Sequence, residues 1–493
     1  MKNRFFFVIL FVFVVMSASA QQKISLTLNE VIKLAQDSSL TAFRYKHMYL
    51  SSYWDYRSFK ANRLPSLSLN FSPVEYSRQL ITRYDSNSDM DVYRQQKSYS
   101  TNGNLMLMQN FTPLGGTFYI NTSLDYLRYF GATTYNQFTA VPLSVGYSHQ
   151  MFGYNQFKWE KKIEPIKFQK AKLQYIYNAE QIASNAITYF FNLAQAQYQL
   201  KNAKNQVDRC DSLYWMGEQK FKILSITQTD LMTLKLDVVN AQNSVYEAEV
   251  AVKKASLNLA AYLGLDKDTQ FDLILPDAPT EIEVDVNQAI ECVHNNSYLI
   301  LEKFQAVTEA ERNLDKTKKQ NRFTANVNAS VGFNQQAEKF KDVYNDPLRR
   351  DVVSVSLTIP IVDWGVRKGQ RNQAENSLNI ARIDQEQNIQ ELEQNVIVTI
   401  SELKSRYYLL QSAQEEQIIA QEVYNANVQR FQNATIDITT LSSSQQRLQN
   451  ALNSYVSTMY QYWSCYYSLR QQTLYDFATG ESLSDKFDFE NLR

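Results

Sequence analysis

The chain has 493 residues but only 12 glycines and 9 prolines, a composition that favours long uninterrupted elements over a string of loop-rich modules. Its 50 basic residues balance its 50 acidic residues, which argues against a nucleic-acid partner. The three cysteines, Cys210, Cys292 and Cys465, are scattered and odd in number, so they do not make a disulfide framework.

The first twenty residues predict a secretory signal peptide. Lys2 and Arg4 precede an almost wholly apolar run from Phe5 to Met16, and Ala18-Ser19-Ala20 offers a small-residue cleavage site. The apolar run is about twelve residues long, whereas a spanning helix needs about twenty. No run of that length follows, so any insertion of the mature chain into a membrane must use strands.

The mature chain should begin with a helix and a strand. A helical pattern runs from Asn29 to about Arg63 and ends at Leu64-Pro65, because proline disfavours helix in the residue before it. Polar and apolar residues then alternate from Ser66 to Phe71, which predicts a strand with two unlike faces. A second alternating strand is expected from Leu143 to Tyr147.

A long helical hairpin should follow. Small or apolar residues recur at steps of three and four from Leu231 to Tyr262, a period that predicts a helix supercoiled against other helices. Short polar and β-branched residues interrupt the pattern at 222–229, where we expect the chain to turn back. The seam residues that we single out in this helix are Leu231, Val238, Ala241 and Val245.

The same elements then return. The opening helix and strand recur at an offset of 258, whereas the returning strand and the long helices recur at an offset of 210. The difference of 48 must be an insertion in the first copy, between Asn70 and Leu143. Its segments Asn104 to Phe111 and Thr117 to Tyr126 predict either a hairpin outside the main sheet or two further strands of it. The second heptad seam contains Leu441, Leu448, Ala451 and Tyr455; it is more polar, so we expect it to be the weaker one.

The predicted organisation therefore has five parts. They are a signal peptide at 1–20, a first repeat at 21–265, a linker at 266–286, a second repeat at 287–475 and an acidic tail at 476–493. In the second repeat, a helix from Val366 to Phe431 would reach about 100 Å. No compact globule accommodates that length.

Alternating strands in an exported chain without a hydrophobic anchor predict a barrel, the closed strand structure that a bilayer accepts. Four strands cannot close a barrel of useful width, so several chains must contribute. The predicted fold class is an α+β membrane protein in which two tandem repeats build a long α-helical tunnel and a transmembrane β-barrel, with four or more strands per protomer.

Particular junctions carry a resemblance to a known family. They are the helix-to-strand junction Leu64-Pro65-Ser66-Leu67, the strand Ser356 to Ile361 with Gly365 after it, and the pairs Lys220-Phe221 and Arg430-Phe431 before the turns. With these in duplicated order, the chain resembles the TolC-like outer-membrane efflux proteins, or outer membrane factors. The resemblance implies a homotrimer in the outer membrane of a Gram-negative cell, with its barrel in lipid and its helical tunnel in the periplasm.

The resemblance also implies a function. It predicts the outer-membrane channel of a tripartite efflux or type I secretion system, which conducts substrates passively from an inner-membrane pump and a periplasmic adaptor (membrane fusion protein). His47, His149 and His294 lack further ligands at metal-binding spacing, so we expect no metal, no cofactor and no enzyme activity. The alternative is an exported coiled-coil scaffold or stalk without a pore.

Family members carry a gate at the turns between the long helices, and the matching positions here are Asp230, Ile436, Thr440 and Ser443. The resemblance places the adaptor-docking tip at Leu224, Ser225, Ala434 and Thr435. Thr440 and Ser443 replace acidic residues of the family pattern, and Ile436 replaces a basic one. Asp230 retains the acidic partner position, although an acid in the first turn of a helix also complements the helix dipole.

Overall fold

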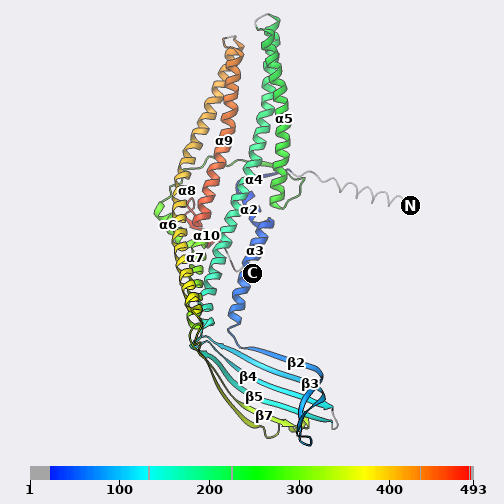
Figure 1. Cartoon of the computed structure of the whole chain (residues 1–493). Helices are drawn as coiled ribbons and strands as arrows, with labels where there is room; N and C mark the ends of the chain where they lie inside the picture. The colour runs from blue at the N-terminus through cyan, green and yellow to red at the C-terminus, as the bar shows by residue number, and fades with distance from the viewer. Residues whose placement is uncertain (1–22, 131–133, 224–225, 434, 488, 490–493) are drawn as a thin grey trace, which may run out of the picture. The chain divides into compact units, whose positions relative to one another are not determined.

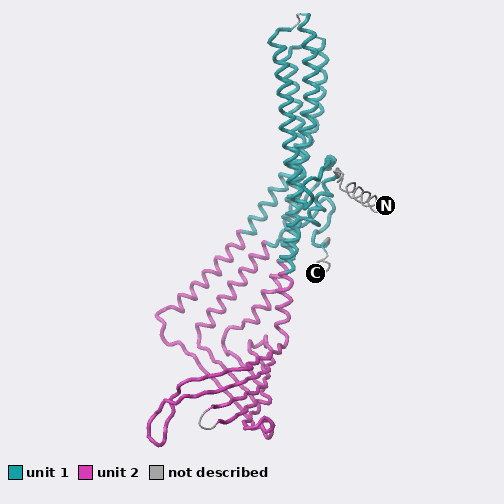
Figure 2. The backbone as a smooth tube through the Cα atoms, turned by 90° about the vertical axis from the view of Figure 1, so that its right-hand side faces the viewer, with its two compact units in different colours: residues 1–50, 171–298, 388–493 teal, residues 51–170, 299–387 magenta. Residues whose placement is uncertain are grey.

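A computed structural model describes residues 23–130, 134–223, 226–433, 435–487 and 489. The chain forms two compact units, one of residues 1–50, 171–298 and 388–493 and the other of residues 51–170 and 299–387 (Figure 2). No helix within the described ranges is long and apolar enough to span a membrane. The predicted signal peptide lies outside these ranges.

Long helices dominate the first unit, and α3, α4 and α8 contribute residues to both units. The helices with their bounds are α2 (Leu28–Ser38), α3 (Leu40–Ala61), α4 (Gln156–Lys222), α5 (Gln228–Leu263), α6 (Val286–Asn296), α7 (Tyr298–Gln320), α8 (Val366–Gln432), α9 (Ile438–Thr473) and α10 (Leu483–Lys486). Figure 1 shows α4 beside α5 and α8 beside α9 as two helical hairpins.

The helix bounds repeat with the two offsets of the sequence. Both α4 and α8 have 67 residues, and both α5 and α9 have 36. Adding 210 to the first and last residues of α4 and α5 gives those of α8 and α9. Adding 258 to the first and last residues of α2 gives those of α6. The predicted interruption of the helical pattern at 222–229 contains the turn of the first hairpin, and the equivalent residues 432–439 of the second copy contain the turn of the second hairpin.

The predicted opening helix from Asn29 to Arg63 is wrong in one respect, because it is two helices. Ser39 separates α2 from α3: its N–H donates to the Ala35 carbonyl (3.3 Å), and its Oγ accepts from the Ala42 N–H (3.0 Å). A buried hydroxyl that binds the backbone in this way competes with helix continuation. Ser297 ends α6 at the matching place.

A six-stranded antiparallel sheet occupies the second unit, in the order β2-β3-β4-β5-β7-β8 (Figure 1). Its strands are β2 (Ser66–Asp85), β3 (Met90–Phe111), β4 (Gly116–Phe130), β5 (Tyr135–Met151), β7 (Thr324–Ala337) and β8 (Leu348–Thr358). The additional segment of the first copy supplies β3 and β4, which lie inside the sheet between β2 and β5. The alternative of a separate hairpin is therefore excluded.

The two faces of this sheet differ in polarity. One apolar row crosses five strands at paired positions, in the order Leu67, Leu107, Ile120, Val145 and Val331. Leu67 is 65% exposed and Val331 is 53% exposed, so the described part of the chain leaves this face uncovered. The opposite face carries small polar residues, such as the paired Ser148 and Asn328, whose side chains hydrogen-bond at 2.6 Å.

The predicted linker and tail have more structure than we expected. A short strand in the linker, β6 (Gln270–Ile274), pairs in parallel with β1 (Lys23–Thr27). The tail forms the hairpin β9 (Tyr475–Asp476) and β10 (Glu481–Ser482) before α10. Asp476 is 5% exposed, so this part of the tail is integrated into the first unit.

A buried ion cluster explains that integration. Arg470 of α9 contacts Glu180 of α4 through Nη2 and Asp476 through Nη1, both at 3.2 Å. The hydroxyl of Tyr466 donates to the second oxygen of Asp476 at 2.5 Å. Burial alone would lower the pKa of Arg470, but the charge of Glu180 and its other neighbours outweighs burial and raises it. The guanidinium therefore stays charged and joins α4, α9 and the tail.

Replacing Arg470 with methionine should destabilise the first unit by about 3–5 kcal/mol, because two buried carboxylates lose their shared cation. The measurement is the melting temperature of the purified protein. Arg371→Met is the matched control, since its ion pair with Glu375 is exposed and such pairs contribute about 0–1 kcal/mol. Equal shifts for the two variants would contradict a structural role for the cluster.

Candidate functional site

The ends of the two hairpins form the candidate site. Helices α4 and α5 are joined across 223–227, and α8 and α9 are joined across 433–437. Leu224, Ser225 and Ala434 of the predicted docking tip lie outside the described residues. Thr435, the fourth, is exposed, and both its N–H and its Oγ1 donate to the Arg430 carbonyl at 2.9 Å.

One apolar cluster lies behind both turns and draws on all four long helices. Its buried members are Leu213, Leu234, Tyr424, Phe431, Leu441, Leu448 and Leu452. Ile436 of the second turn packs against this cluster. The position that carries a basic residue in the family pattern thus contributes hydrophobic contact, and the two hairpins share a core at the candidate site.

Lys220 adds a polar link between the hairpins. Its ammonium group donates to the Phe431 carbonyl at 2.7 Å and lies 4.5 Å from the centre of the Phe431 ring. The carbonyls at the end of a helix have no partner within the helix and carry partial negative charge. Lys220 of α4 therefore satisfies the Phe431 carbonyl at the end of α8, while Thr435 satisfies the carbonyl of the preceding residue, Arg430.

Helices α5 and α9 begin with caps that use the same kinds of side chain, a hydroxyl and a carboxylate, in exchanged positions. At the start of α5, Thr227 is the N-cap, and its N–H and Oγ1 donate to the Asp230 carboxylate at 3.0 and 2.8 Å. At the start of α9, in the equivalent position of the second copy, Asp437 is the N-cap and accepts from the Thr440 N–H at 2.8 Å. Each cap thus retains one hydroxyl and one carboxylate.

Both carboxylates are held in the ionised form. The backbone N–H of Thr227 is the main cause that lowers the pKa of Asp230, and the side chain of Thr440 is the main cause that lowers the pKa of Asp437. Thr440 is uncharged where the family pattern has an acidic residue, but Asp437 supplies a carboxylate that we did not predict. The sequence could have indicated this cap, because Asp437 stands at the position equivalent to Thr227, and aspartate is a preferred N-cap residue.

The predicted gate residues are not all brought together. Ile436 joins the shared cluster, and the hydrogen bonds described for Asp230 lie within its own cap. Thr440 and Ser443 are exposed along α9. Asp230 thus has the capping role that we considered as one alternative, and a role in gating needs a separate argument.

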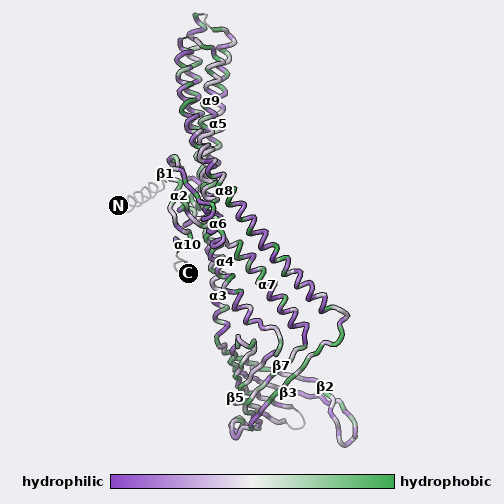
Figure 3. Tube along the Cα trace, turned by 90° about the vertical axis from the view of Figure 1, so that its left-hand side faces the viewer, coloured by the Kyte–Doolittle hydropathy of each residue, from purple (hydrophilic) through white to green (hydrophobic). Residues whose placement is uncertain are grey.

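The predicted seams lie on covered faces of their helices, and hydrophobic and hydrophilic residues alternate along these helices in Figure 3. In α5, Ala241 is buried, and Leu231, Val238 and Val245 are half-buried; in α9, Leu441, Leu448 and Ala451 are buried, and Tyr455 is half-buried. Six residues of α5 but twelve of α9 are buried. Within one chain, the second seam helix is therefore the more extensively buried one. Its polar members are satisfied locally, as where the Ser444 hydroxyl donates to the Leu441 carbonyl at 2.7 Å.

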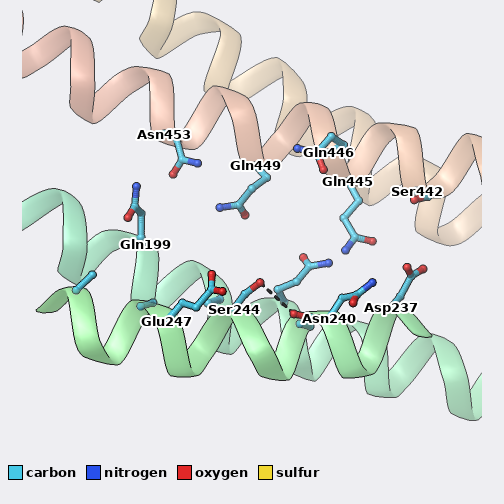
Figure 4. A pocket seen from close by; sticks show the side chains of 15 residues that line it. Gln199, Asp237, Asn240, Ser244, Glu247, Ser442, Gln445, Gln446, Gln449 and Asn453 are labelled. Atoms are coloured by element: carbon cyan, nitrogen blue, oxygen red, sulfur yellow. Dashed lines mark hydrogen bonds between the residues drawn. The ribbon is translucent and has the colours of Figure 1, made fainter. Parts of the chain in front are cut away.

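A polar groove of about 580 Å³ separates α5 from α9 beside the cluster (Figure 4). Amides and small polar groups line most of it, including Gln199 and Gln206 of α4, Asn240 and Ser244 of α5, and Gln445, Gln449 and Asn453 of α9. Burial raises the pKa of Asp237 at its edge. Amide side chains can both donate and accept hydrogen bonds, so this surface can bind either donor or acceptor groups.

The described part of the chain contains no group of three or more histidine, cysteine, aspartate or glutamate side chains arranged to hold a metal ion. The carboxylates nearest the two turns, Asp230 and Asp437, are occupied by helix caps. The candidate site therefore consists of the shared apolar cluster, the two helix caps and the Lys220 link, of which the cluster and the link hold the ends of the two hairpins to each other.

Comparison with known proteins supports this description. A model of the family described as "Outer membrane efflux protein" matches residues 300–473. A comparison with curated proteins finds no significant match.

Solved structures extend the similarity to almost the whole chain. The Campylobacter jejuni CmeC outer membrane channel is 13% identical, with a TM-score of 0.64 over 94% of this chain and 90% of that one. The Vibrio cholerae outer membrane protein VceC is 12% identical, with a TM-score of 0.63 over 91% of this chain and 95% of that one. A structure of CusC is 14% identical, with a TM-score of 0.64 over 90% of this chain and 91% of that one.

At these identities the structures establish a shared fold, namely long helices with an antiparallel sheet. The family-model match over 300–473 includes β7, β8, α8 and α9. The chain therefore shares the fold of these outer-membrane channels, and its second half resembles the outer membrane efflux protein family.

Proposed function

We propose that this protein is the outer-membrane channel of a tripartite efflux system and works as a homotrimer. The observation that carries the proposal is the joining of one helical unit to a sheet whose apolar face is exposed, in the fold of solved outer-membrane channels. Substrates would pass through it passively. The energy would come from an inner-membrane pump, linked through a periplasmic adaptor.

The sheet is the part that would lie in lipid. A bilayer requires every backbone N–H and C=O to be hydrogen-bonded, so the strands of several copies must close on themselves. A pore-free stalk has no use for a sheet whose leucines and valines are exposed on one face and whose serines and asparagines line the other. This polarity favours the channel over the scaffold alternative.

The candidate site would be the gate. In the present state, the shared cluster and the Lys220 link hold the two hairpins together. Opening would move α8 and α9 away from α4 and α5, with the polar groove offering a surface of exchangeable hydrogen bonds. Such a change is a shift between two packings of the same helices. Leu224, Ser225, Ala434 and Thr435 remain the proposed contacts of the adaptor.

Channel activity can be tested on the purified protein. The detergent-extracted protein should be a heat-modifiable trimer that conducts ions in planar bilayers, because the closed sheet encloses water. Deleting its gene should sensitise cells to some members of a panel of toxic amphiphiles, and re-expression should restore resistance. A water-soluble monomer or dimer without conductance would instead support the scaffold alternative.

The gate can be tested at Lys220. Lys220→Met keeps the aliphatic stem but removes the cation that closes the end of α8, so the open probability in planar bilayers should rise several-fold while the trimer persists. Lys222→Met is the matched control, because Lys222 is an exposed lysine just beyond it on the same helix. If both variants open equally often, the Lys220 link does not hold the gate.

A further inference from the structure

The sheet of this chain has two strands more than the duplicated pattern requires. Each copy of the repeat supplies a pair of strands, β2 with β5 and β7 with β8, and the additional β3 and β4 are inserted between β2 and β5. Strand β3 pairs with β2 along most of its length and with β4 from Lys97 to Phe111. The inserted strands are therefore full members of the sheet.

Reciprocal glycine and tyrosine pairs hold β4 against β5. The Tyr119 ring of β4 lies over Gly146 of β5, and the Tyr147 ring of β5 lies over Gly116 of β4; a Cβ at either glycine would overlap the tyrosine. The two pairs lie on opposite faces, because Tyr119 faces the polar side and Tyr147 the apolar side. An inserted strand is thus fixed to the repeat strand on both of its faces.

The two-faced pattern also continues through the insertion. Leu107 and Ile120 occupy the apolar row between Leu67 and Val145. On the other face, Asn104 pairs with Asn70 and with Ser123. An added hairpin outside a membrane would not need this continuity, whereas a hairpin that contacts lipid on one side and water on the other requires it.

The edges of the sheet are suited to another copy of the chain. Among the described residues, strands β2 and β8 each have a neighbour on one side only. Because the sheet has six strands in strict antiparallel alternation, β8 of one copy runs antiparallel to β2 of the next. The same contact therefore repeats from copy to copy and can close by rotation. The shortest strand, β8, has 11 residues, enough to cross the hydrocarbon core when tilted.

We propose that three copies close an eighteen-stranded pore, with β3 and β4 in its wall and lipid against the row from Leu67 to Val331. This inference rests on the proposed function. With strands about 4.8 Å apart and tilted by about 40°, the backbone radius is about 18 Å for eighteen strands and about 12 Å for twelve. Barrels of 16–18 strands enclose an aqueous channel. The pore is then wide and lined by paired serines and asparagines, and solute selection falls to the helical tip.

The test counts strands directly and measures the width of the pore. The full-length trimer, purified from outer membranes, should show eighteen strands by electron cryo-microscopy. In planar bilayers, polyethylene glycols added on the sheet side should enter up to a hydrodynamic radius about 1.5-fold larger than in a variant that lacks residues 86–130. That variant retains residues 131–134 to connect β2 to β5 and keeps four strands per copy.

A second variant controls for the loss of chain. Residues 82–93 pair only within the β2–β3 hairpin, and replacing them with Asn-Gly makes a two-residue turn without removing a strand. Its polymer cut-off should equal that of the unmodified protein. A conducting trimer with twelve strands, or equal cut-offs for all three proteins, overturns the eighteen-stranded pore and leaves the proposed function intact. A monomer that does not conduct overturns both. If the variant without residues 86–130 fails to fold, the strand count of the unmodified trimer still decides.

Discussion

A strand that enters lipid must have both of its backbone edges hydrogen-bonded, and in the proposed channel that constraint governs the sheet. Within the described part of one chain, β2 and β8 are each bonded on one side. The alternation of leucine and valine with serine and asparagine suits a sheet that closes around water. In the proposed channel, trimer formation would be part of the fold, because a single chain leaves two open edges and an exposed apolar face within its described residues.

The helical unit depends on a different constraint, which is side-chain packing between its helices. Its two hairpins share the cluster of leucines and aromatics around Phe431, and polar interactions surround this cluster instead of extending it. Lys220 links the two hairpins, Thr227 and Asp437 cap the first turns of α5 and α9, and amide side chains line the neighbouring groove. In the proposed gate, apolar contact at one place and exchangeable polar contact beside it would allow the two hairpins to separate without unfolding.

Much of this architecture was predictable because the chain repeats itself. A single offset relates both ends of α4 and α5 to those of α8 and α9, since heptad seams and turn residues mark helix ends clearly. The break at Ser39 was not predictable, because a serine that caps one helix looks like any polar residue on a helical surface. The length of β2 was missed where the register shifts between Ser72 and Glu75 and interrupts the alternation. At the tip, the resemblance compared single positions and therefore found no acid at Thr440. It overlooked Asp437, the N-cap of α9, whose carboxylate has the capping role that Asp230 has three residues into the cap of α5.

The ion cluster around Arg470 ties distant parts of the sequence together. Glu180 belongs to α4, whereas Arg470 and Asp476, which complete the cluster, lie at the far end of the second copy of the repeat. The same unit contains β1 paired with β6, so contacts within it join segments from the beginning, the middle and the end of the chain. A chain truncated before Arg470 would therefore lack the cation that α4 contacts in the folded unit, even though all of α4 and α5 would be present.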